Sequence, residues 1–494
     1  MKRELRPHQS QAIEMLRQSL GSGKRRPVLQ APTGFGKTRL AAAVVEGALA
    51  KKKRVIFTVP ALSLVGQTVE AFWNDGIREV GVIQGTHAMT DWSRPVQVAS
   101  VQTLQRRPMP EADVVIIVEC HRWFDFYGKW MMDPAWQSRR FIGLSATPWT
   151  RGLGRYFDDL IIAATTQDLI AGGYLSPFRV FAPSHPDLTG VRTVAGDYHE
   201  GDLSGVMNDN PLVADVVLTW LRRAQNRSTF CFAVDRAHAK HLQEKFAEAG
   251  VPTGYIDAYT PTKERDEIER KFSDGEIRVV CNVGCLTTGI DWDVRCIVLA
   301  RPTKSEMLFV QIIGRGLRPA EGKEDCLILD HSDTHLRLGF VTDIHHEVLD
   351  DGRARAKPKA SDRIRLPKEC PQCAFLKPPR VRECPACGFK AEAVSNIEIA
   401  DGELIEITGR KKRDCPVSKD EKASFYAQLK GYAQTRGYAT GWAAHQFREK
   451  FDVWPNGYKD VPAMEPTPKV LSWIKSRHIA WAKSKQRHAE QATA

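Results

Sequence analysis

Residues 31–38 read Ala31-Pro32-Thr33-Gly34-Phe35-Gly36-Lys37-Thr38, a glycine-rich loop between the apolar run Pro27–Gln30 and a helix-like stretch that starts at Arg39. Glycines let the backbone N–H groups of such a loop close around phosphate oxygens, with the N-terminus of the following helix behind them. We expect Lys37 to reach the β- and γ-phosphates of a nucleotide and the Thr38 hydroxyl to bind Mg²⁺. The first position of the usual pattern is Ala31 instead of glycine, and an ordinary glycine-rich turn is the alternative.

Length and composition restrict the class of protein. The chain has 494 residues, which predicts about three domains. It is 42% hydrophobic and 26% charged, so disorder over its whole length is excluded. There is no run of about 18 apolar residues, as a transmembrane helix would need, and the first residues lack the apolar core of a signal peptide. We therefore expect a cytoplasmic protein.

Short apolar runs alternate with helix-like stretches over the first 345 residues, which is typical of parallel α/β sheets. The predicted strands are Pro27–Gln30, Arg54–Val59, Val96–Ser100, Val114–Val118, Arg140–Leu144, Ser228–Ala233, Ile277–Asn282, Cys296–Ala300 and Cys326–Asp330. Asp235–Ala249 and Thr262–Ser273 are predicted helices, and Gly172–Gly201 is expected to hold the crossover between two consecutive α/β units.

A carboxylate follows the predicted strand Val114–Val118 directly. Glu119 stands at the carboxyl end of this strand, where it can face a γ-phosphate and orient a water molecule for attack. Cys120 and His121 come next, and the following strand is succeeded by Ser145-Ala146-Thr147-Pro148.

These motifs, in this order, resemble those of the superfamily-two helicases, in particular the DEAH/DECH-type translocases, over about residues 5–335. The resemblance implies two tandem RecA-like lobes, residues 1–165 and 166–345, with ATP and Mg²⁺ between them. It implies that Gln9 reads the adenine base and that Ser145-Ala146-Thr147 couples hydrolysis to lobe movement. It also implies that a nucleic-acid strand is gripped in the first lobe by Pro60, Gln102 and Thr103.

Two motifs of the second lobe also resemble this family. Leu286-Thr287-Thr288-Gly289-Ile290-Asp291 resembles the motif that touches nucleic acid, here through Thr287 and Thr288, and nucleotide, through Gly289 and Asp291. The segment from Gln311 to Arg318 resembles the arginine-finger motif. Arg315 and Arg318 are three residues apart, hence on one helical face, and can stabilise charge on a transferring phosphoryl group. A surface helix with ion pairs is the alternative.

One position departs from the family. The family reads Asp-Glu-Cys-His where this chain reads Val118-Glu119-Cys120-His121. The aspartate normally holds Mg²⁺, directly or through water, and valine cannot do so. Because Mg²⁺ neutralises charge that develops on the phosphates, we expect a much weakened ATPase that partly retains ATP binding. The alternative is another carboxylate that compensates, but Asp113 lies at the wrong end of the strand.

Four cysteines form a separate pattern, which is Cys370 and Cys373 followed, ten residues later, by Cys384 and Cys387. Two C-x-x-C knuckles supply the four thiolates of a closed, structural Zn²⁺ site, and metal binding would fold this short segment. A redox dithiol would need a thioredoxin-like context that is absent from the sequence, and unligated reduced cysteine is the remaining alternative.

Positive charge is concentrated beyond residue 350. The net charge is +12, of which residues 1–350 carry +1, residues 351–390 carry +7 and residues 391–494 carry +4. We expect a basic linker at 346–367, the zinc module at 368–390 and a small, mainly helical, aromatic-rich domain at 391–494. Nucleic acid is the simplest acidic partner, and a solvated surface is the alternative. Phe425, Leu429 and Tyr432 are expected in the core of the last domain, whereas backbone contacts are expected from Lys475, Arg477, Lys483, Lys485 and Arg487.

This architecture is similar to that of RadD-type bacterial DNA-repair helicases and related phage-encoded helicases. The resemblance implies an ATP-dependent helicase or translocase acting on DNA repair, recombination or replication intermediates, in a bacterial or phage-infected cell. A repair, replication or nuclease protein is the expected protein partner. Two alternatives are a nucleic-acid-binding adaptor or clamp without significant ATPase, which Val118 motivates, and the motor subunit of a restriction or defence complex.

Overall fold

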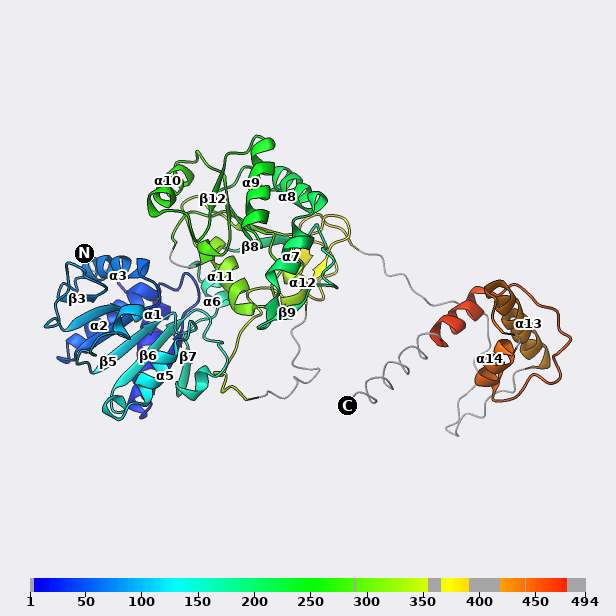
Figure 1. The fold of residues 1–494 in the computed structure, drawn as a ribbon, viewed down its shortest axis with the longest axis horizontal. Helices are drawn as coiled ribbons and strands as arrows, with labels where there is room; N and C mark the ends of the chain where they lie inside the picture. The colour runs from blue at the N-terminus through cyan, green and yellow to red at the C-terminus, as the bar shows by residue number, and fades with distance from the viewer. Residues whose placement is uncertain (1–3, 288–289, 354–365, 391–417, 440, 478–494) are drawn as a thin grey trace. The chain divides into compact units, whose positions relative to one another are not determined.

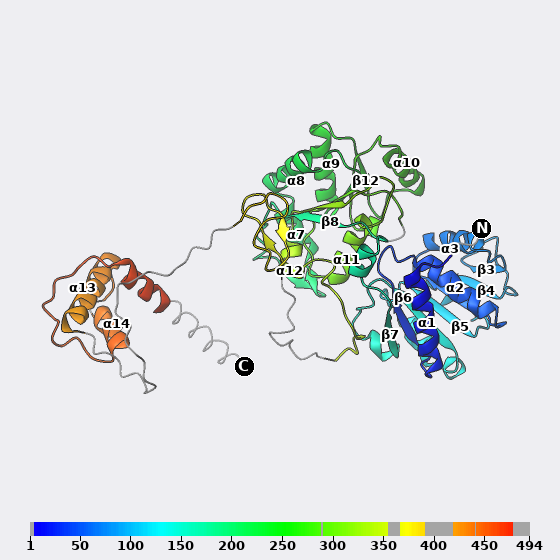
Figure 2. The ribbon, with the colours of Figure 1, turned by 180° about the vertical axis from the view of Figure 1, so that it is seen from behind.

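A computed structural model of the chain describes residues 4–287, 290–353, 366–390, 418–439 and 441–477. The chain divides into two compact units, Met1–Ala393 and Val394–Ala494. Figures 1 and 2 show that the first unit contains two α/β lobes and that the second is mainly helical. Among the helices of the described residues, none combines the length and apolar character that crossing a membrane requires.

The first lobe is built on a seven-stranded parallel sheet with the order β3-β4-β2-β5-β6-β1-β7. Its strands are β1 (Pro27–Gln30), β2 (Val55–Val59), β3 (Val80–Ile83), β4 (Val96–Ser100), β5 (Val114–Val118), β6 (Arg140–Ser145) and β7 (Asp159–Ile162). One face packs against α1 (Pro7–Gly21), α2 (Lys37–Leu49) and α3 (Ser63–Asn74), and the other against α4 (Val101–Leu104) and α5 (Asp125–Met132). Because β5, β6 and β1 are parallel neighbours, the residues that follow them meet at one edge of the sheet.

The second lobe has a six-stranded parallel sheet with the order β12-β13-β11-β14-β15-β8. Its strands are β8 (Phe178–Phe181), β11 (Thr229–Phe232), β12 (Thr253–Ile256), β13 (Val279–Asn282), β14 (Cys296–Leu299) and β15 (Cys326–Asp330). One face packs against α8 (Asn210–Arg223) and α9 (Arg236–Glu248), and the other against α10 (Thr262–Ser273) and α11 (Glu306–Gly316). Helices α6 (Thr166–Ala171), α7 (Glu200–Met207) and α12 (Thr334–Leu338) complete the connections.

The predicted fold class is confirmed, and each strand predicted from the sequence is present to within two residues at either end. Four strands of the two large sheets were not predicted: β3, β7, β8 and β12. The segment Gly172–Gly201 is more than a crossover, because it contributes β8 to the edge of the second sheet and a hairpin of β9 (Thr193–Val194) and β10 (Asp197–Tyr198). β8 reads Phe-Arg-Val-Phe, and four positions with one charged residue among three apolar ones are too few to separate a strand from a loop by pattern.

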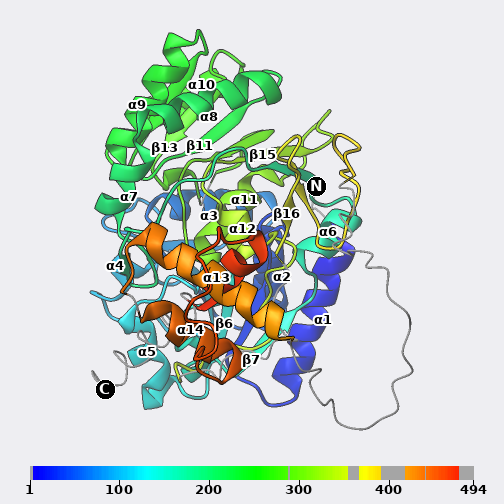
Figure 3. The same cartoon turned by 90° about the vertical axis from the view of Figure 1, so that its right-hand side faces the viewer.

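Two small elements lie beyond the lobes. Residues 366–390 form a short antiparallel ribbon, β16 (Lys368–Glu369) with β17 (Leu376–Lys377), which carries the four cysteines. In the second unit, α13 (Lys419–Arg436), α14 (Trp442–Phe451) and a helical segment at 468–477 pack around a small apolar core (Figures 1 and 3). The expected basic linker falls mostly on residues 354–365, outside the described part of the chain.

Candidate nucleotide site between the two lobes

The glycine-rich loop joins β1 to α2 and has two glycines in left-handed backbone conformations. The φ angles are 86° at Gly34 and 85° at Gly36, which is the N-cap of α2, and glycine adopts such angles without strain. A Cβ atom at Gly36 would lie 2.3 Å from Gln9 Nε2, so a side chain there would displace the residue packed on the loop. No described side chain caps α2, so the N–H groups of its first turn remain for an anion, and Thr38 is exposed on this turn.

Helix α1 holds two polar side chains against this loop. Gln9 Nε2 donates to the carbonyls of Phe35 at 2.9 Å and Gly36 at 3.3 Å. His8 Nε2 lies 3.1 Å from the same Phe35 carbonyl, and its ring packs edge-on against Phe35 and Tyr174. Burial lowers the pKa of His8, which favours the neutral ring. Gln9 therefore fixes the shape of the loop in this structure.

Lys37 and Glu119 form an ion pair within the first lobe. Lys37 Nζ lies 2.7 Å from Glu119 Oε1, and both side chains are largely buried. Glu119 follows β5 with a φ of 51°, an uncommon angle for a residue with a Cβ. Burial alone would raise the pKa of the Glu119 carboxyl, but Lys37 and His121 together outweigh it and hold this pKa well below its ordinary value. The carboxylate is therefore ionised and lies beside the glycine-rich loop.

His121 connects the two lobes. Its Nδ1 lies 2.8 Å from Ser145 Oγ at the end of β6, and its Nε2 lies 2.9 Å from the amide nitrogen of Gln311 on α11. The same Gln311 nitrogen donates to Thr147 Oγ1 at 3.2 Å. Because an amide nitrogen only donates, His121 Nε2 accepts and Nδ1 carries the ring proton. Residues after two central strands of the first lobe thus bind one side chain of the second.

The two arginines of the second lobe meet at the Ile290 carbonyl. Arg315 Nη1 donates to this oxygen at 3.0 Å, and Arg318 Nη1 binds it and the Asp291 carboxylate. Helix α11 ends at Gly316, so Arg318 lies just beyond the helix and not on it as expected. Burial and Arg318 lower the pKa of the buried Arg315, whereas Glu119 and Asp291 raise it. Arg318 is ion-paired, while Arg315 is buried within the electrostatic reach of the first lobe.

The lobes approach each other closely at Thr33 and Gly314. A Cβ atom at Gly314 would lie 2.7 Å from the Cβ of Thr33. Thr33 Oγ1 and Arg315 Nε are both buried without a hydrogen-bond partner among the described residues. Such atoms cost about 1–3 kcal/mol each unless a ligand satisfies them. A hydroxyl and a guanidinium N–H, left unsatisfied beside the glycine-rich loop, fit the oxygens of a nucleotide phosphate.

Val118 occupies the last position of β5, where it pairs with Leu144 of β6 and packs against the apolar core of the lobe. Its side chain offers no oxygen to a metal ion. Asp113, which precedes the other end of β5, lies 3.1 Å from Lys53 Nζ and 3.4 Å from Arg139 Nη1. The nearest acidic residue of the strand is therefore engaged away from the loop, and Glu119 is the carboxylate at the site.

The expected nucleic-acid contacts lie at the carboxyl ends of strands in both lobes. Gln102 Nε2 donates to the Pro60 carbonyl at 2.7 Å, which brings together the residues after β2 and β4, and Thr103 Oγ1 lies 3.0 Å from Ser100 Oγ. Thr287 is buried in a short 3₁₀ helix, Cys285–Thr287. Two further residues expected in this motif, Thr288 and Gly289, lie outside the described part of the chain, whereas Asp291 is described and binds Arg318.

Two family models match the lobes that form this site. Residues 2–150 match the model described as "Type III restriction enzyme, res subunit", and residues 212–320 match "Helicase conserved C-terminal domain". The chain belongs to the superfamily-two helicases. The expected resemblance is thereby confirmed.

Individual relatives agree with this assignment. This helicase is 26% identical over 375 residues to a 51.5 kDa protein of a Lactococcus phage, covering 73% of this chain and 77% of that one. It is 30% identical over 353 residues to IRC3 of Saccharomyces cerevisiae, which is named as an ATP-dependent helicase. The matched region covers 66% of this chain but only 51% of the yeast protein. A fragment of an HsdR subunit of a type I restriction enzyme from Vibrio vulnificus has a similar fold, with a TM-score of 0.53, 22% identity and coverage of 71% and 70%.

The four cysteines of the helicase lie together in two knuckles of the same design. Their sulfur atoms lie within 4.8 Å of one another, with Sγ–Sγ distances of 3.7 Å for Cys370–Cys387 and for Cys373–Cys384. Four thiolates at about 2.3 Å from a tetrahedral Zn²⁺ would be about 3.8 Å apart. In each knuckle the residue after the second cysteine, Ala374 or Gly388, has a left-handed φ. Its backbone N–H donates to the carbonyl of the knuckle's first cysteine. The donor set and its spacing fit Zn²⁺.

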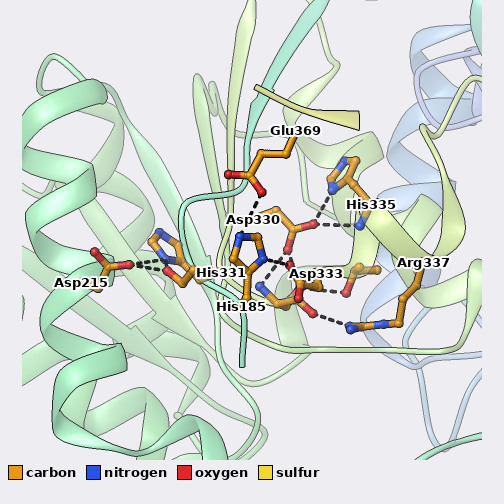
Figure 4. Close-up of polar contacts among 11 residues, drawn as sticks. His185, Asp215, Asp330, His331, Asp333, His335, Arg337 and Glu369 are labelled. Atoms are coloured by element: carbon orange, nitrogen blue, oxygen red, sulfur yellow. Dashed lines mark hydrogen bonds and ion pairs between the residues drawn. The ribbon is translucent and has the colours of Figure 1, made fainter. Parts of the chain in front are cut away.

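The segment 366–390, which keeps the name zinc module for its expected metal, packs against the second lobe on both sides of its ribbon. The rings of Phe181 and Phe375 pack edge-on, and Arg223 donates to the Cys373 carbonyl at 2.8 Å. Figure 4 shows His185 between two carboxylates, Asp333 of the lobe and Glu369 of the ribbon, at 2.7 and 2.9 Å. The module therefore has a fixed position on the edge of this lobe beside β8.

Several residues of the helicase site were not assigned a role from the sequence. His8 adjoins Gln9 and Gly314 lies within the Gln311–Arg318 segment, but neither was given a role of its own, and Tyr174 belongs to no motif. Their contacts arise only when distant segments meet. Gln311 could have been found, because it lies one helical turn before Arg315 and therefore on the same face of α11.

Proposed function

We propose that the chain is an ATP-dependent DNA helicase or translocase that acts on repair, recombination or replication intermediates. The observation that carries this proposal is the contact between His121 and Gln311, which joins the lobes beside the Lys37–Glu119 pair. Such a bond lets the occupancy of the nucleotide site bias the position of one lobe against the other. The names of the relatives, an ATP-dependent helicase and a restriction-enzyme subunit, support the same class of motor.

Each lobe would contribute to the nucleotide site. Bound ATP with Mg²⁺ supplies the phosphoryl group that is transferred to water. Lys37 would exchange Glu119 for the β- and γ-phosphates, which leaves the Glu119 carboxylate to orient the water and accept its proton, and Arg315 and Arg318 would stabilise developing charge. The remaining contacts to nucleotide and Mg²⁺ would come from Gln9, Thr33, Gly34, Gly36, Thr38, Gly289 and Asp291.

We infer that a DNA strand crosses both lobes along the residues that follow their strands. Pro60, Gln102 and Thr103 would contact it in the first lobe, and Thr287 and Thr288 in the second. The domain limits we propose are 1–165, 166–345, 346–367, 368–390 and 391–494, with Zn²⁺ bound by the four cysteines of the fourth segment.

Val118 should weaken this motor without removing its nucleotide site. The apolar side chain cannot hold Mg²⁺, and the loss of one metal contact costs several kcal/mol of transition-state stabilisation, or about a hundredfold or more in rate. ATP binding should persist, because Lys37 and the loop are intact.

The test compares DNA-stimulated phosphate release by this chain and by Val118→Asp. We expect the variant to hydrolyse ATP at least tenfold faster, and equal rates would remove the proposed role of Val118. Adding Lys37→Ala to Val118→Asp should abolish ATP-driven strand separation, whereas Lys51→Ala, an exposed lysine just beyond α2, should not. Comparing how strongly single-stranded, duplex and forked DNA and RNA stimulate phosphate release identifies the preferred substrate.

A second candidate function, a nucleic-acid-binding adaptor or clamp, is favoured by Val118 alone. It predicts salt-dependent DNA binding with no DNA-stimulated phosphate release, even after Val118→Asp. The likeness to an HsdR subunit adds a further candidate, the motor of a restriction or defence complex. That function would require a separate nuclease partner, which co-purification with a DNA-cleaving subunit would reveal.

A further inference from the structure

The second unit has more aromatic side chains than its small core can bury. Its core is formed by Tyr426, Leu429, Ala443, Phe447, Val470 and Ile474. Of the three residues expected in this core, Leu429 is fully buried, whereas Phe425 and Tyr432 only pack against its margin. Other rings lie outside it, and Tyr438 and Trp454 are 41% and 42% exposed. Large apolar surfaces left on a small domain mark interaction sites.

These outer rings form two neighbouring groups, together called the aromatic ridge here: Tyr432, Tyr438 and Trp442 in one, and His445 and Trp454 in the other. The rings of Tyr438 and Trp442 are stacked, with centroids 4.7 Å apart and planes 10° apart. Tyr432 stacks on Tyr438 at 6.2 Å. Trp442 and His445 lie one turn apart on α14, and His445 contacts Trp454 at 5.2 Å. The ridge thus runs from the end of α13 along α14.

Basic side chains stand at both ends of the ridge. The Arg436 guanidinium lies 5.9 Å from the ring centroid of Tyr432, and that of Arg448 lies 4.8 Å from Trp454. The neighbouring acidic residues are Glu449, which lies 3.2 Å from Arg477, and the exposed Asp452. Two guanidinium groups therefore flank stacked rings, a charge pattern that complements a flexible polyanion with planar groups.

We propose that the aromatic ridge binds unpaired nucleotides. Bases would stack on the exposed rings of Tyr438 and Trp454, while Arg436 and Arg448 neutralise the flanking phosphates. Duplex nucleic acid would bind more weakly, because its bases are already stacked on one another. This site is separate from the strand contacts proposed for the lobes, and it does not depend on ATP.

The test measures binding of fluorescent oligonucleotides to the full-length chain without ATP. Tyr438→Ala with Trp454→Ala should weaken binding of oligothymidine about tenfold or more, because stacking of one base on an aromatic ring is worth about 1–3 kcal/mol. Tyr438→Phe with Trp454→Phe retains a ring at each position and should bind within about twofold of the parent chain. Oligouridine in a parallel series distinguishes RNA from DNA, and a duplex without single-stranded ends is the control that offers no unpaired bases.

Two further controls separate this site from the lobes and from loss of folding. Leu471→Ala removes an equally exposed apolar side chain of the same unit and should have no effect, and circular dichroism reports helix content. Photocrosslinking with 5-iodouracil oligonucleotides should label Tyr438, Trp442 or Trp454. Equal affinities of the alanine and phenylalanine pairs, or crosslinks confined to the lobes, would overturn the proposal. Selective loss of polyglutamate binding in the alanine pair, with oligonucleotide binding unchanged, would also overturn it and assign the ridge to an acidic protein.

Discussion

The amide nitrogen of Gln311 in the second lobe lies 2.9 Å from His121 Nε2 and 3.2 Å from Thr147 Oγ1 in the first. One side chain therefore contacts the residues that follow both β5 and β6. His121 in turn lies 3.3 Å from the Glu119 carboxylate, which is paired with Lys37. A change at Lys37 can reach the second lobe through the side chains of Glu119 and His121, and opening of the lobes would break both bonds of Gln311 together.

The chain of contacts from Glu119 through His121 to Gln311, here called the relay, can be tested by mutation. The variants are Gln311→Ala, His121→Ala and the two together, all in a Val118→Asp background. We expect each single change to lower DNA-stimulated phosphate release by about tenfold, because a hydrogen bond between lobes is lost. In the double variant the rate of phosphate release should fall by much less than the product of the two single-variant factors, which corresponds to a coupling energy of about 0.5–3 kcal/mol. Gln18→Ala, an exposed glutamine on α1, is the control. Strictly multiplicative losses would contradict the relay.

Asp330 predicts a stability effect with a defined pH dependence. The carboxylate is fully buried and accepts the His335 N–H at 2.8 Å and the Ser332 N–H at 2.9 Å. Burial raises the pKa of Asp330, but His335 and these donors lower it to about 2. Since this lies below the pKa of an unfolded aspartate, about 3.9, the contribution is present at neutral pH and is lost as pH falls from about 4 to about 2.

We therefore expect Asp330→Asn to reduce the free energy of unfolding at pH 7 by about 2–4 kcal/mol. The difference from the parent chain should shrink as pH falls from about 4 to about 2, because below this range the aspartate is protonated in the folded chain too and resembles asparagine. Urea unfolding of the second lobe, followed by circular dichroism at several pH values, measures it. Glu244→Gln, an exposed change on α9, should have no such effect, and a difference independent of pH would count against the argument.

The central strands and the glycine-rich loop at 31–38 could be predicted because each is a local pattern. Strands such as Val114–Val118 are continuous apolar runs, as expected for a sheet covered on both faces. The edge strands β3, β7, β8 and β12 were missed because each has only four residues, among them a polar residue or a glycine that interrupts the apolar run. For the same reason the connecting segment Gly172–Gly201 was not recognised as part of the second sheet.

The individual contacts around the glycine-rich loop were beyond the reach of a single sequence. Gln9 is expected to read the adenine base, and no local pattern predicts that its amide also donates to the Phe35 and Gly36 carbonyls. The approach of Gly314 to Thr33 joins residues far apart in the chain, and no periodicity signals it. By contrast, the clustering of Cys370, Cys373, Cys384 and Cys387 was predictable, because two short knuckles with fixed spacing can close only a few geometries.

Replacing Arg223 should weaken the docking of the zinc module on the second lobe without affecting metal binding. Arg223 binds the Cys373 carbonyl, and its guanidinium lies 4.2 Å from the Phe181 ring centroid, so Arg223→Ala removes a docking contact but no thiolate. We expect one zinc per chain by elemental analysis, with faster amide hydrogen exchange over residues 366–390. Arg222→Ala, at an exposed neighbouring position, is the matched control.

Cys384→Ser is the comparison variant in the same assays, because it removes a metal ligand and leaves the docking contact of Arg223 in place. It should lose the zinc and increase exchange throughout the module, because a site of three thiolates no longer closes the fold. If Arg223→Ala lost zinc as completely as Cys384→Ser, docking and metal binding would be one event, and the separate docking role would be wrong.

Gly314→Ala tests whether the lobes work in the closed arrangement seen here. The added Cβ would lie 2.7 Å from the Thr33 Cβ, so the lobes should be held apart by a few tenths of an ångström or more. In a Val118→Asp background we expect DNA-stimulated phosphate release to fall about tenfold, since small displacements of catalytic groups are costly. ATP affinity should change much less, because most of the proposed contacts belong to the first lobe.

A loss of folding would not explain this result. Alanine stabilises a helix by about 0.5–1 kcal/mol relative to glycine, so α11 itself should become more stable and the melting temperature should not fall. Gly66→Ala, in α3, adds the same methyl group where no atom lies within 4 Å and should leave turnover unchanged. Equal turnover of Gly314→Ala and Gly66→Ala would show that the contact between Thr33 and Gly314 is not part of the active arrangement.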